Sequence, residues 1–286
     1  MMKSWLLLSG KNKVCALLEL YYFPTATCAY KVRLTLAEKG VDFMHRVLDR
    51  DAGDLVTPAY LAMNPNAVVP TMVHEGQVII ESSIIMTYCE EAFEGPRLLP
   101  DDALLRARIA AWMKKADDLY LPATGAVTYG VFRRKEVLTK TAEQLAVYYA
   151  DIPDETRRAA RRQVVEQGIM APATQKGIKT LYQMLSDMED ALAEQRFLSG
   201  ETYGLADAAL TPFVSRLEEL SFAFLWEGFP HLKDWWQAIK ARPSFGTVFN
   251  AYPNEARKHG LRTSGEEVGD IVRGIISDIA GDNAGH

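Results

Sequence analysis

Residues 64–88, NPNAVVPTMVHEGQVIIESSIIMTY, constrain the fold of this 286-residue chain more than any other stretch. An apolar pair runs into Pro70, and residues 71–74 and 77–80 read as two short strands joined by a tight Glu-Gly turn. Apolar residues then recur at helical spacing, which predicts a helix that begins at or near Ser82. The sequence therefore predicts an extended entry, a β-hairpin and a helix in direct succession.

Two features of this stretch suit a ligand. An X-Pro bond adopts the cis form at modest cost, and a proline in a strand pattern lies at an edge or entry, so Val69 is expected to turn its backbone N–H and C=O outward. Ser82 places a hydroxyl and free N–H groups at a helix N-terminus, which attracts carboxylates, and Glu81 can bind an ammonium group. A short peptide that carries an α-amino acid at one end fits all three.

The residues before this stretch complete a recognisable order of elements. Residues 18–22 read as a strand, a helical pattern runs from Cys28 to a stop at Lys39-Gly40, and residues 44–48 read as a second strand. A helical crossover implies that these two strands are parallel. With a loop and one irregular helix over residues 49–63, the N-terminal part has the β-α-β-α-β-β-α order of a thioredoxin-like α/β domain.

A Pro/Gly/Asp-rich linker at residues 94–102 marks the best domain boundary. After it, apolar residues line one face of a long helix and no convincing strand follows, so the second domain is expected to be all-α: Leu105, Ile109, Trp112, Ala116 and Leu119. We therefore expect an N-terminal extension (1–16), a thioredoxin-like domain (17–94) and a helical domain (103–286). Residues 266–282 form a short amphipathic tail helix that must dock on its own domain, the cleft or a partner subunit.

Composition narrows the range of partners. The chain has 32 Lys and Arg against 37 Asp and Glu, a net charge of -5, which argues against nucleic acid or an anionic membrane as the main partner. Its 3 cysteines make no metal-type spacing and fit a reducing cytoplasm, so no metal is expected. No stretch reaches the length of a membrane span.

The pattern NPxxxVP, then a hairpin, then ESS resembles the glutathione-binding half of the cytosolic glutathione transferase superfamily. The resemblance implies that Val69, before a cis Pro70, pairs with the cysteinyl backbone of glutathione. It also implies that Glu81 and Ser82 hold the γ-glutamyl end, that glutathione is the co-substrate, and that the protein is a cytoplasmic homodimer. NxxAVVPT, VTYG and ARPSF look most like the glutathione-dependent reductive dehalogenases of chlorinated hydroquinones and their zeta-like relatives, with aryl-ether-cleaving transferases as a second resemblance.

The resemblance continues in the helical domain, over residues 198–212, LSGETYGLADAALTP. The family caps its core helix there with Ser or Thr and places Asp three residues later. Here Asp207 is present but the cap position is Gly204, which still serves as an N-cap. Asp207 is therefore interpreted as structural, and Trp235 in the later PHLKDWW segment as a core residue.

The catalytic group is expected in the loop before the first helix. A thiol has a pKa of roughly 8.5, so a donor hydrogen bond and a helix N-terminus help to ionise glutathione. Cys28 falls where the resembled dehalogenases carry their cysteine, where the helix dipole is expected to lower its pKa, and it can resolve a glutathionylated intermediate by disulfide exchange. Thr25 and Thr27 remain candidate hydroxyl donors for plain conjugation, and the simpler interpretation makes Cys28 a small buried residue.

The second substrate is expected against the helical domain. Tyr120, Tyr129 and Phe132 are candidate pocket walls, although aromatics at this spacing are also typical of a core. Four arginines at 157, 158, 161 and 162 read as a solvated, salt-bridged helix face or as an anion site at the cleft or dimer interface. The resulting prediction is a glutathione transferase acting on a hydrophobic, aromatic electrophile. Its alternatives are a reductive dehalogenase, an aryl-ether-cleaving transferase or a non-catalytic binding or assembly module.

Overall fold

The computed structural model describes residues 18–50 and 52–283, so the expected N-terminal extension lies outside the described residues. A four-stranded sheet has the order β2-β1-β3-β4. β1 and β2 are parallel and the other pairs are antiparallel. The strands are β1 (Leu18–Tyr22), β2 (Met44–Val47), β3 (Thr71–His74) and β4 (Gln77–Ile80). The predicted thioredoxin-like order is confirmed, and both hairpin strands have the predicted bounds.

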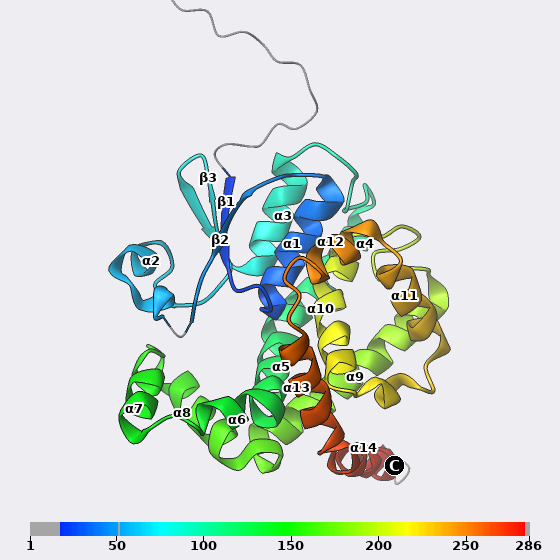
Figure 1. Ribbon diagram of the computed structural model, residues 1–286. Helices are drawn as coiled ribbons and strands as arrows, with labels where there is room; N and C mark the ends of the chain where they lie inside the picture. Colours follow the sequence, from blue (N-terminus) through cyan, green and yellow to red (C-terminus); the bar gives the residue numbers. More distant parts are fainter. Residues whose placement is uncertain (1–17, 51, 284–286) are drawn as a thin grey trace, which may run out of the picture.

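Helices cover both sides of this sheet (Figure 1). α1 (Thr27–Lys39) and α3 (Ser82–Ala92) pack together on one face, where alternate β1 side chains are fully buried. η1 (Asp54–Val56) and α2 (Pro58–Met63) lie on the other side. α1 ends at Gly40, whose φ of 66° suits glycine, and the predicted stop is confirmed.

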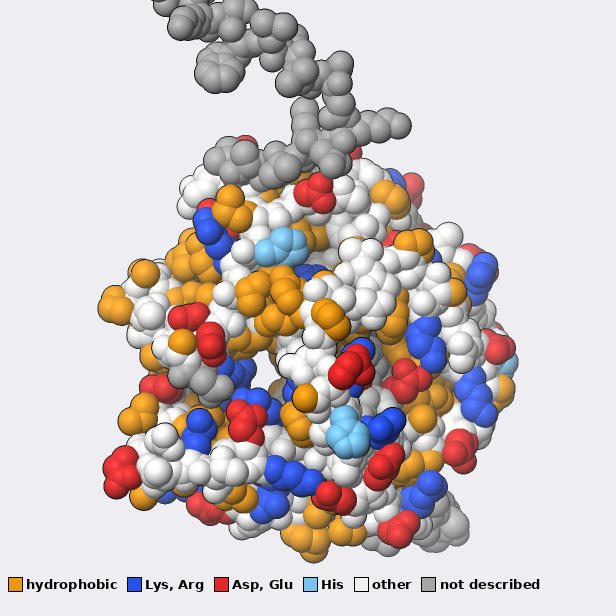
Figure 2. Space-filling view, viewed as in Figure 1, with side chains coloured by type: hydrophobic (Ala, Val, Ile, Leu, Met, Phe, Trp, Pro, Cys, Tyr) orange, Lys and Arg blue, Asp and Glu red, His pale blue; other side chains and the backbone are white. Residues whose placement is uncertain are grey.

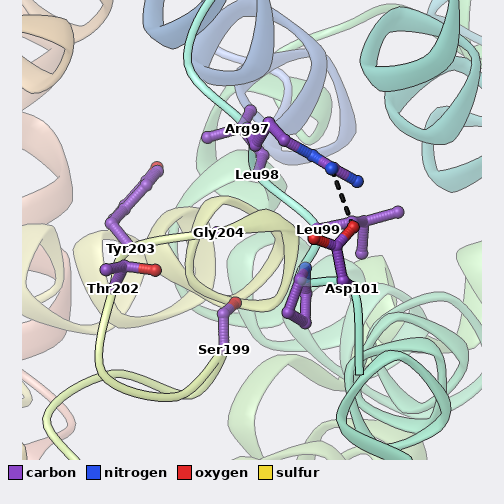
Figure 3. A pocket seen from close by; sticks show the side chains of 9 residues that line it. Arg97, Leu98, Leu99, Asp101, Ser199, Thr202, Tyr203 and Gly204 are labelled. Atoms are coloured by element: carbon purple, nitrogen blue, oxygen red, sulfur yellow. Dashed lines mark ion pairs between the residues drawn. The ribbon is translucent and has the colours of Figure 1, made fainter. Parts of the chain in front are cut away.

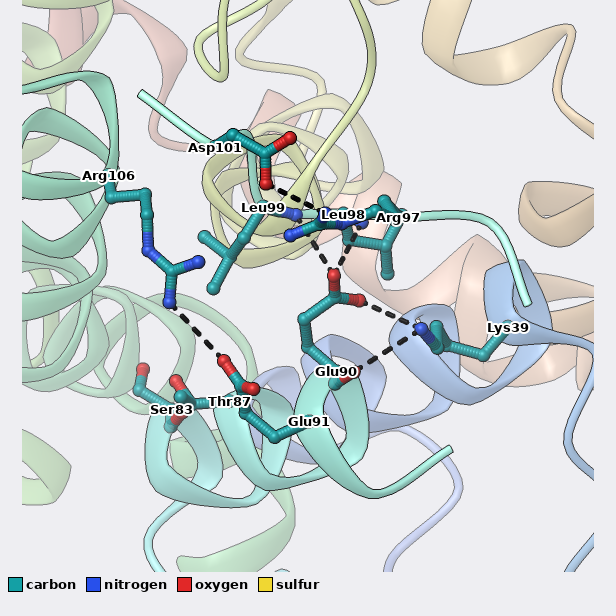
Figure 4. A network of polar contacts seen from close by, with 10 residues as sticks. All are labelled: Lys39, Ser83, Thr87, Glu90, Glu91, Arg97, Leu98, Leu99, Asp101 and Arg106. Carbon is teal, nitrogen blue, oxygen red and sulfur yellow. Dashed lines mark hydrogen bonds and ion pairs between the residues drawn. The ribbon is translucent and has the colours of Figure 1, made fainter. Parts of the chain in front are cut away.

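The linker between the domains is held by one buried carboxylate (Figure 4). Glu90 accepts hydrogen bonds from the backbone N–H groups of Leu98 (3.1 Å) and Leu99 (3.3 Å) and from Lys39 Nζ (3.0 Å). Gly95 passes so close to α1 that an added Cβ would lie 2.6 Å from the carbonyl oxygen of Lys39. The linker is therefore fixed against the N-terminal domain over its first half.

The second domain is built from helices, as predicted. They are α4 (Ala103–Lys115), η2 (Ala116–Tyr120), α5 (Leu121–Thr128), η3 (Tyr129–Arg133), α6 (Arg134–Val137), α7 (Ala142–Ala150), α8 (Glu155–Gln167), η4 (Gly168–Met170), α9 (Pro172–Glu194), α10 (Leu205–Glu219), η5 (Ala223–Trp226), α11 (Pro230–Lys240), α12 (Pro243–Phe249), α13 (Glu255–Glu266) and α14 (Gly269–Asn283). η2 and η3 are π-helical turns within the long α4–α6 segment.

Four of the five residues predicted for the buried face of this long segment lie in the core or pack against it: Leu105, Ile109, Trp112 and Ala116. Ile109, Met113, Ala116 and Tyr120 are buried, whereas Leu119 is 50% exposed. Leu119 lies in the π-helical turn η2, where the regular α-helical spacing used for the prediction does not hold. The prediction that Leu119 faces the core is wrong.

Asp207 organises the start of α10 from a fully buried position. Its carboxylate accepts hydrogen bonds from Trp235 Nε1 (2.8 Å) and from the N–H groups of Leu198 (2.8 Å), Ser199 (3.2 Å) and Gly204 (3.0 Å). All four donors belong to the segments around the start of α10, so the carboxylate holds these segments together. The prediction that Asp207 holds the helix start is borne out by these contacts.

The structure explains why glycine stands at position 204, where the family has a Ser or Thr cap. The linker and this turn are in direct contact and together line a small cavity of about 140 Å³ (Figure 3). An added Cβ at Gly204 would lie 2.4 Å from the Leu98 carbonyl oxygen, so a Ser or Thr cannot fit there. Ser199 supplies the missing cap instead, because its Oγ accepts a hydrogen bond from the Ala206 N–H (3.1 Å).

The tail helix docks on its own domain. α14 packs against α9, with Val272 fully buried and Ile275 8% exposed. The Arg273 guanidinium lies 3.8 Å from the centre of the Phe224 ring. Of the three docking sites that the sequence left open, contact with its own domain is the one present in the structure.

Buried charges join the two domains. Lys31 of α1 is fully buried and donates to Ser83 Oγ (2.9 Å) and to Asp117 Oδ1 (2.5 Å) of the helical domain. Arg33 donates to the Val248 carbonyl (2.8 Å). Because unpaired buried charges are costly, these contacts fix how the helical domain sits beside the sheet.

Candidate active site

The Val69–Pro70 bond is cis, as expected. The Val68 carbonyl points inward, where it accepts from Tyr60 Oη (2.6 Å) and Asn64 Nδ2 (3.0 Å). In a trans peptide the C=O and the following N–H point in opposite directions. The N–H of Val69 therefore points outward, and no described residue accepts a hydrogen bond from it.

The N-terminus of α3 also presents free donors. Glu81 has a left-handed backbone, with φ 70°, which non-glycine residues rarely adopt and which is concentrated at ligand-binding positions. No side chain caps the helix, and Ser82 is 4% exposed with no hydrogen-bond partner for its hydroxyl among the described residues. The exposed Glu81 carboxylate lies beside these donors. The arrangement fits an α-amino acid group, with its carboxylate at the helix end and its ammonium on Glu81.

The loop before α1 is fixed from two directions. Arg33 donates to the Pro24 carbonyl (3.1 Å), and Arg216 of α10 donates to the Thr25 carbonyl (3.0 Å). Arg216 also contacts Thr128 Oγ1 (3.2 Å), so it joins this loop to two helices of the second domain. Thr25 is partly exposed, and Thr27 begins α1 with 8% exposure.

Cys28 lies in the first turn of α1 and donates through Sγ to the Val69 carbonyl (3.1 Å). Burial raises the pKa of its thiol to about 11, although Lys31 and the backbone N–H groups of the first turn act in the opposite direction. The expected lowering of this pKa by the helix terminus is therefore wrong, because desolvation outweighs it. This contact occupies the Val69 carbonyl, so the prediction that both the N–H and the C=O of Val69 are free is wrong for the C=O; among the described residues, only the N–H lacks a partner.

The three aromatic candidates for the second-substrate pocket occupy different surroundings. Tyr120 is 3% exposed and its ring centre lies 6.1 Å from that of Phe213, so it belongs to the helical core and is corrected as a pocket wall. Phe132 packs against α13, where an added Cβ on Gly260 would meet its ring at 2.9 Å. Tyr129 faces the N-terminal domain, and its hydroxyl oxygen accepts a hydrogen bond from Arg50.

Among the described residues, the arginines of α8 have no acidic partners that would make the predicted salt-bridged surface. Asp154 instead caps the helix, accepting from the Arg157 N–H (2.6 Å). Arg158 donates to the Ile152 carbonyl, and Arg162 lies 4.8 Å from the Tyr149 ring centre. Within the described ranges none of these arginines forms an ion pair with an acidic side chain.

The described residues show neither a metal-binding group nor a membrane-spanning helix. No group of three or more His, Cys, Asp and Glu side chains within residues 18–50 and 52–283 is placed to hold a metal ion. Within the same ranges, no helix combines the length and apolar character that crossing a membrane requires.

Comparison with known proteins agrees with this geometry. Residues 20–97 match the family model for the glutathione S-transferase N-terminal domain, and residues 164–243 match that for its C-terminal domain. The chain belongs to the glutathione S-transferase family.

Relatives cover most of the chain at low identity. It is 29% identical to the tetrachloro-p-hydroquinone reductive dehalogenase of Sphingobium chlorophenolicum, over 80% of this chain and 94% of that protein. It is 25% identical to glutathione S-transferase TCHQD of Arabidopsis thaliana, over 85% and 93%. The crystal structure of the β-etherase LigF from Sphingobium sp. strain SYK-6 superposes with a TM-score of 0.75 at 24% identity, over 82% of this chain and 99% of that one, and shows the shared fold.

Proposed function

We propose that this protein is a glutathione transferase that joins glutathione to a hydrophobic, aromatic electrophile. The observation that carries the proposal is the pair of free backbone donor sites: the N–H of Val69, a residue that contacts Cys28 through its carbonyl, and the N-terminus of α3. The first suits the cysteinyl backbone of glutathione and the second its γ-glutamyl end. Glutathione bound across both would present its sulfur to residues 25–28.

Conjugation requires only a positioned and partly ionised glutathione thiol. The thiolate attacks an electrophilic carbon, a carbon–sulfur bond forms, and the leaving group departs with its bonding electrons. A hydroxyl or N–H donor at the start of α1 stabilises the thiolate more than the thiol, which raises the fraction ionised at neutral pH. Thr25, Thr27 and Cys28 are the proposed donors.

The raised pKa of Cys28 favours conjugation over a reductive reaction as the main activity. A reductive reaction requires the Cys28 thiolate to attack the sulfur of a glutathionylated substrate, leaving a Cys28–glutathione disulfide and the reduced product. The name of the Sphingobium chlorophenolicum relative keeps this alternative open for our chain. Glutathione is proposed as co-substrate, with no metal.

The test compares three proteins: the wild type, Thr27→Ala and Cys28→Ser. Each is passed over a glutathione-affinity column and assayed with glutathione and 1-chloro-2,4-dinitrobenzene, and then with a chlorinated hydroquinone. We expect retention and conjugation by the wild type, and reduced conjugation by Thr27→Ala. Retention without turnover of either substrate would contradict an enzyme and favour the binding or assembly module.

We also propose a cytoplasmic homodimer, because this arrangement is typical of the glutathione S-transferase family. Large apolar side chains are exposed on one strand and three successive helical segments around the linker: Val78, Ile84, Leu104 and Leu119. Burial of such side chains in an interface would favour association. Light scattering should give about twice the 31.9 kDa of the chain, and a mass equal to one chain at micromolar concentration would refute the dimer.

A further inference from the structure

Arginines from two domains converge beside the proposed active site. The Tyr129 hydroxyl of η3 is hydrogen-bonded to Arg50, which follows β2, and the Arg161 guanidinium of α8 lies 3.1 Å from the Tyr129 ring centre. Arg157, one turn earlier on α8, donates to the Asn66 carbonyl (3.1 Å) in the loop that leads to Val69. We call Arg50, Arg157 and Arg161 the arginine cluster.

The arginine cluster lies next to the catalytic loop. The Arg50 guanidinium lies 4.6 Å from the centre of the Phe23 ring, and Phe23 packs with Val69 beside Cys28. Figure 2 shows an opening between the α2 side of the N-terminal domain and α7–α8, with both basic and acidic side chains around it. A molecule in this opening can therefore approach both the cluster and the sulfur of glutathione.

Among the described residues, the charges nearest the arginine cluster are mostly positive, with Asp154 as the exception. Burial would raise the pKa of the Tyr129 phenol, but the positive charges of Arg50, Arg161 and Arg133 lower it to about 8. The pKa of Arg157 is lowered by burial and by repulsion from Arg161 and Arg50, against the attraction of Asp154. Like charges this close destabilise one another, and a bound anion relieves that repulsion.

We infer that the arginine cluster and the Tyr129 hydroxyl bind an anionic group, a carboxylate or a phenolate, on the second substrate. The inference rests on the proposed function and narrows it to aromatic electrophiles that carry such a group. Guanidinium groups suit it because each presents several donors in a planar fork that matches a carboxylate. The chain as a whole has a net charge of -5, so the positive charge of the arginine cluster is a local feature and does not reflect the overall composition.

The competing interpretation gives these arginines a structural role, in which they pack on Phe23 and Tyr129 and hold the two domains at a fixed spacing. A second alternative is that the cluster binds the glycyl carboxylate of glutathione itself. Each interpretation predicts that removing one arginine charge weakens the binding of a different ligand.

The experiment measures binding of an unreactive pair of probes, 3,5-dinitrobenzoate and its methyl ester, by equilibrium dialysis against protein saturated with S-methylglutathione. The ester has the same ring without the charge, and neither probe has a leaving group, so the result does not depend on turnover. The proteins are the wild type, Arg161→Gln, Arg50→Gln and the control Arg162→Gln, an exposed residue on the same helix. The Kd of glutathione is measured separately for each.

We expect the wild type to prefer the carboxylate, and Arg161→Gln and Arg50→Gln each to weaken its binding about ten-fold, as for the loss of a charge-assisted hydrogen bond. Ester binding, glutathione binding and the Arg162→Gln control should remain unchanged. Equal binding of both probes by the wild type would overturn the inference. The inference would also be overturned if the variants weakened the binding of both probes alike, as a structural role predicts, or if they weakened the binding of glutathione alone.

Turnover separates this inference from the proposed function. If the wild type conjugates 1-chloro-2,4-dinitrobenzene but shows no preference for the dinitrobenzoate probe, the anion site is wrong and the transferase proposal stands. If it prefers the probe in an Arg161-dependent way but turns over no electrophile, the anion site stands and the proposed activity fails.

Discussion

The Cys28 thiol should be protonated and slow to react at neutral pH. Its pKa of about 11 compares with an ordinary value of about 8.5, so at pH 8 the thiolate fraction is about 0.1% against about 25%, a deficit of about 240-fold. A more basic thiolate is intrinsically more nucleophilic, with a Brønsted coefficient of about 0.45, which returns about 13-fold. The net expectation is a reaction with disulfides about 20-fold slower than that of an ordinary thiol.

The assay follows the reaction of Cys28 with 4,4′-dithiodipyridine between pH 7 and 9.5, with free glutathione in the same buffer as the reference. Cys28→Ser provides the blank for the other cysteines, and mass spectrometry identifies the modified residue. The logarithm of the rate should rise by one for each pH unit across the whole range. A plateau below pH 9, or a rate above that of glutathione, would show that the helix terminus outweighs burial and would refute the reasoning.

Three further predictions concern groups that the structure places in tight surroundings. Tyr129 should give a phenolate absorbance step near pH 8, and Tyr129→Phe should remove it. Because the folded pKa lies below the ordinary value of about 10, ionisation of Tyr129 adds to the stability of the folded chain as the pH rises from about 8 to about 10, and this gain is lost as the pH falls back through 8. A first absorbance step near pH 10 would exclude the lowered pKa. Asp207→Ala should cost about 4 kcal/mol or more in urea unfolding, since it leaves four buried donors unpaired, whereas Asp234→Ala on an exposed face of α11 should change little. Gly204→Ala should cost about 1–3 kcal/mol through its clash with the Leu98 carbonyl, and unchanged stability would show that the linker yields freely.

Local patterns were sufficient for the N-terminal domain. The short strand patterns over residues 71–80 and the Glu-Gly turn predicted both hairpin strands, and the helix start at Ser82 followed from neighbouring residues, whereas the cis form of Pro70 was implied by the family resemblance. Asp207 was also predicted to be structural, because the motif around it is local. Each of these features depends on residues close together in the chain.

Long-range contacts determined what the sequence could not give. Arg216 reaches the Thr25 carbonyl from 191 positions away, and nothing near either residue indicates the pairing. The pKa of Cys28 depends on burial by segments packed around it, so its place at a helix terminus suggested the wrong direction. The arginines of α8 were noticed as a cluster, but only the fold brings Arg50 to them.

Glutathione binding at the α3 terminus is the central claim, and calorimetry on Ser82→Ala tests it most directly. The matched control is Thr87→Ala, an exposed position on the same helix. Loss of a charge-assisted hydrogen bond, worth about 1.5–3 kcal/mol, predicts glutathione binding weaker by roughly ten-fold or more in Ser82→Ala and unchanged in Thr87→Ala. Equal affinity of the wild type and Ser82→Ala for glutathione would contradict the site.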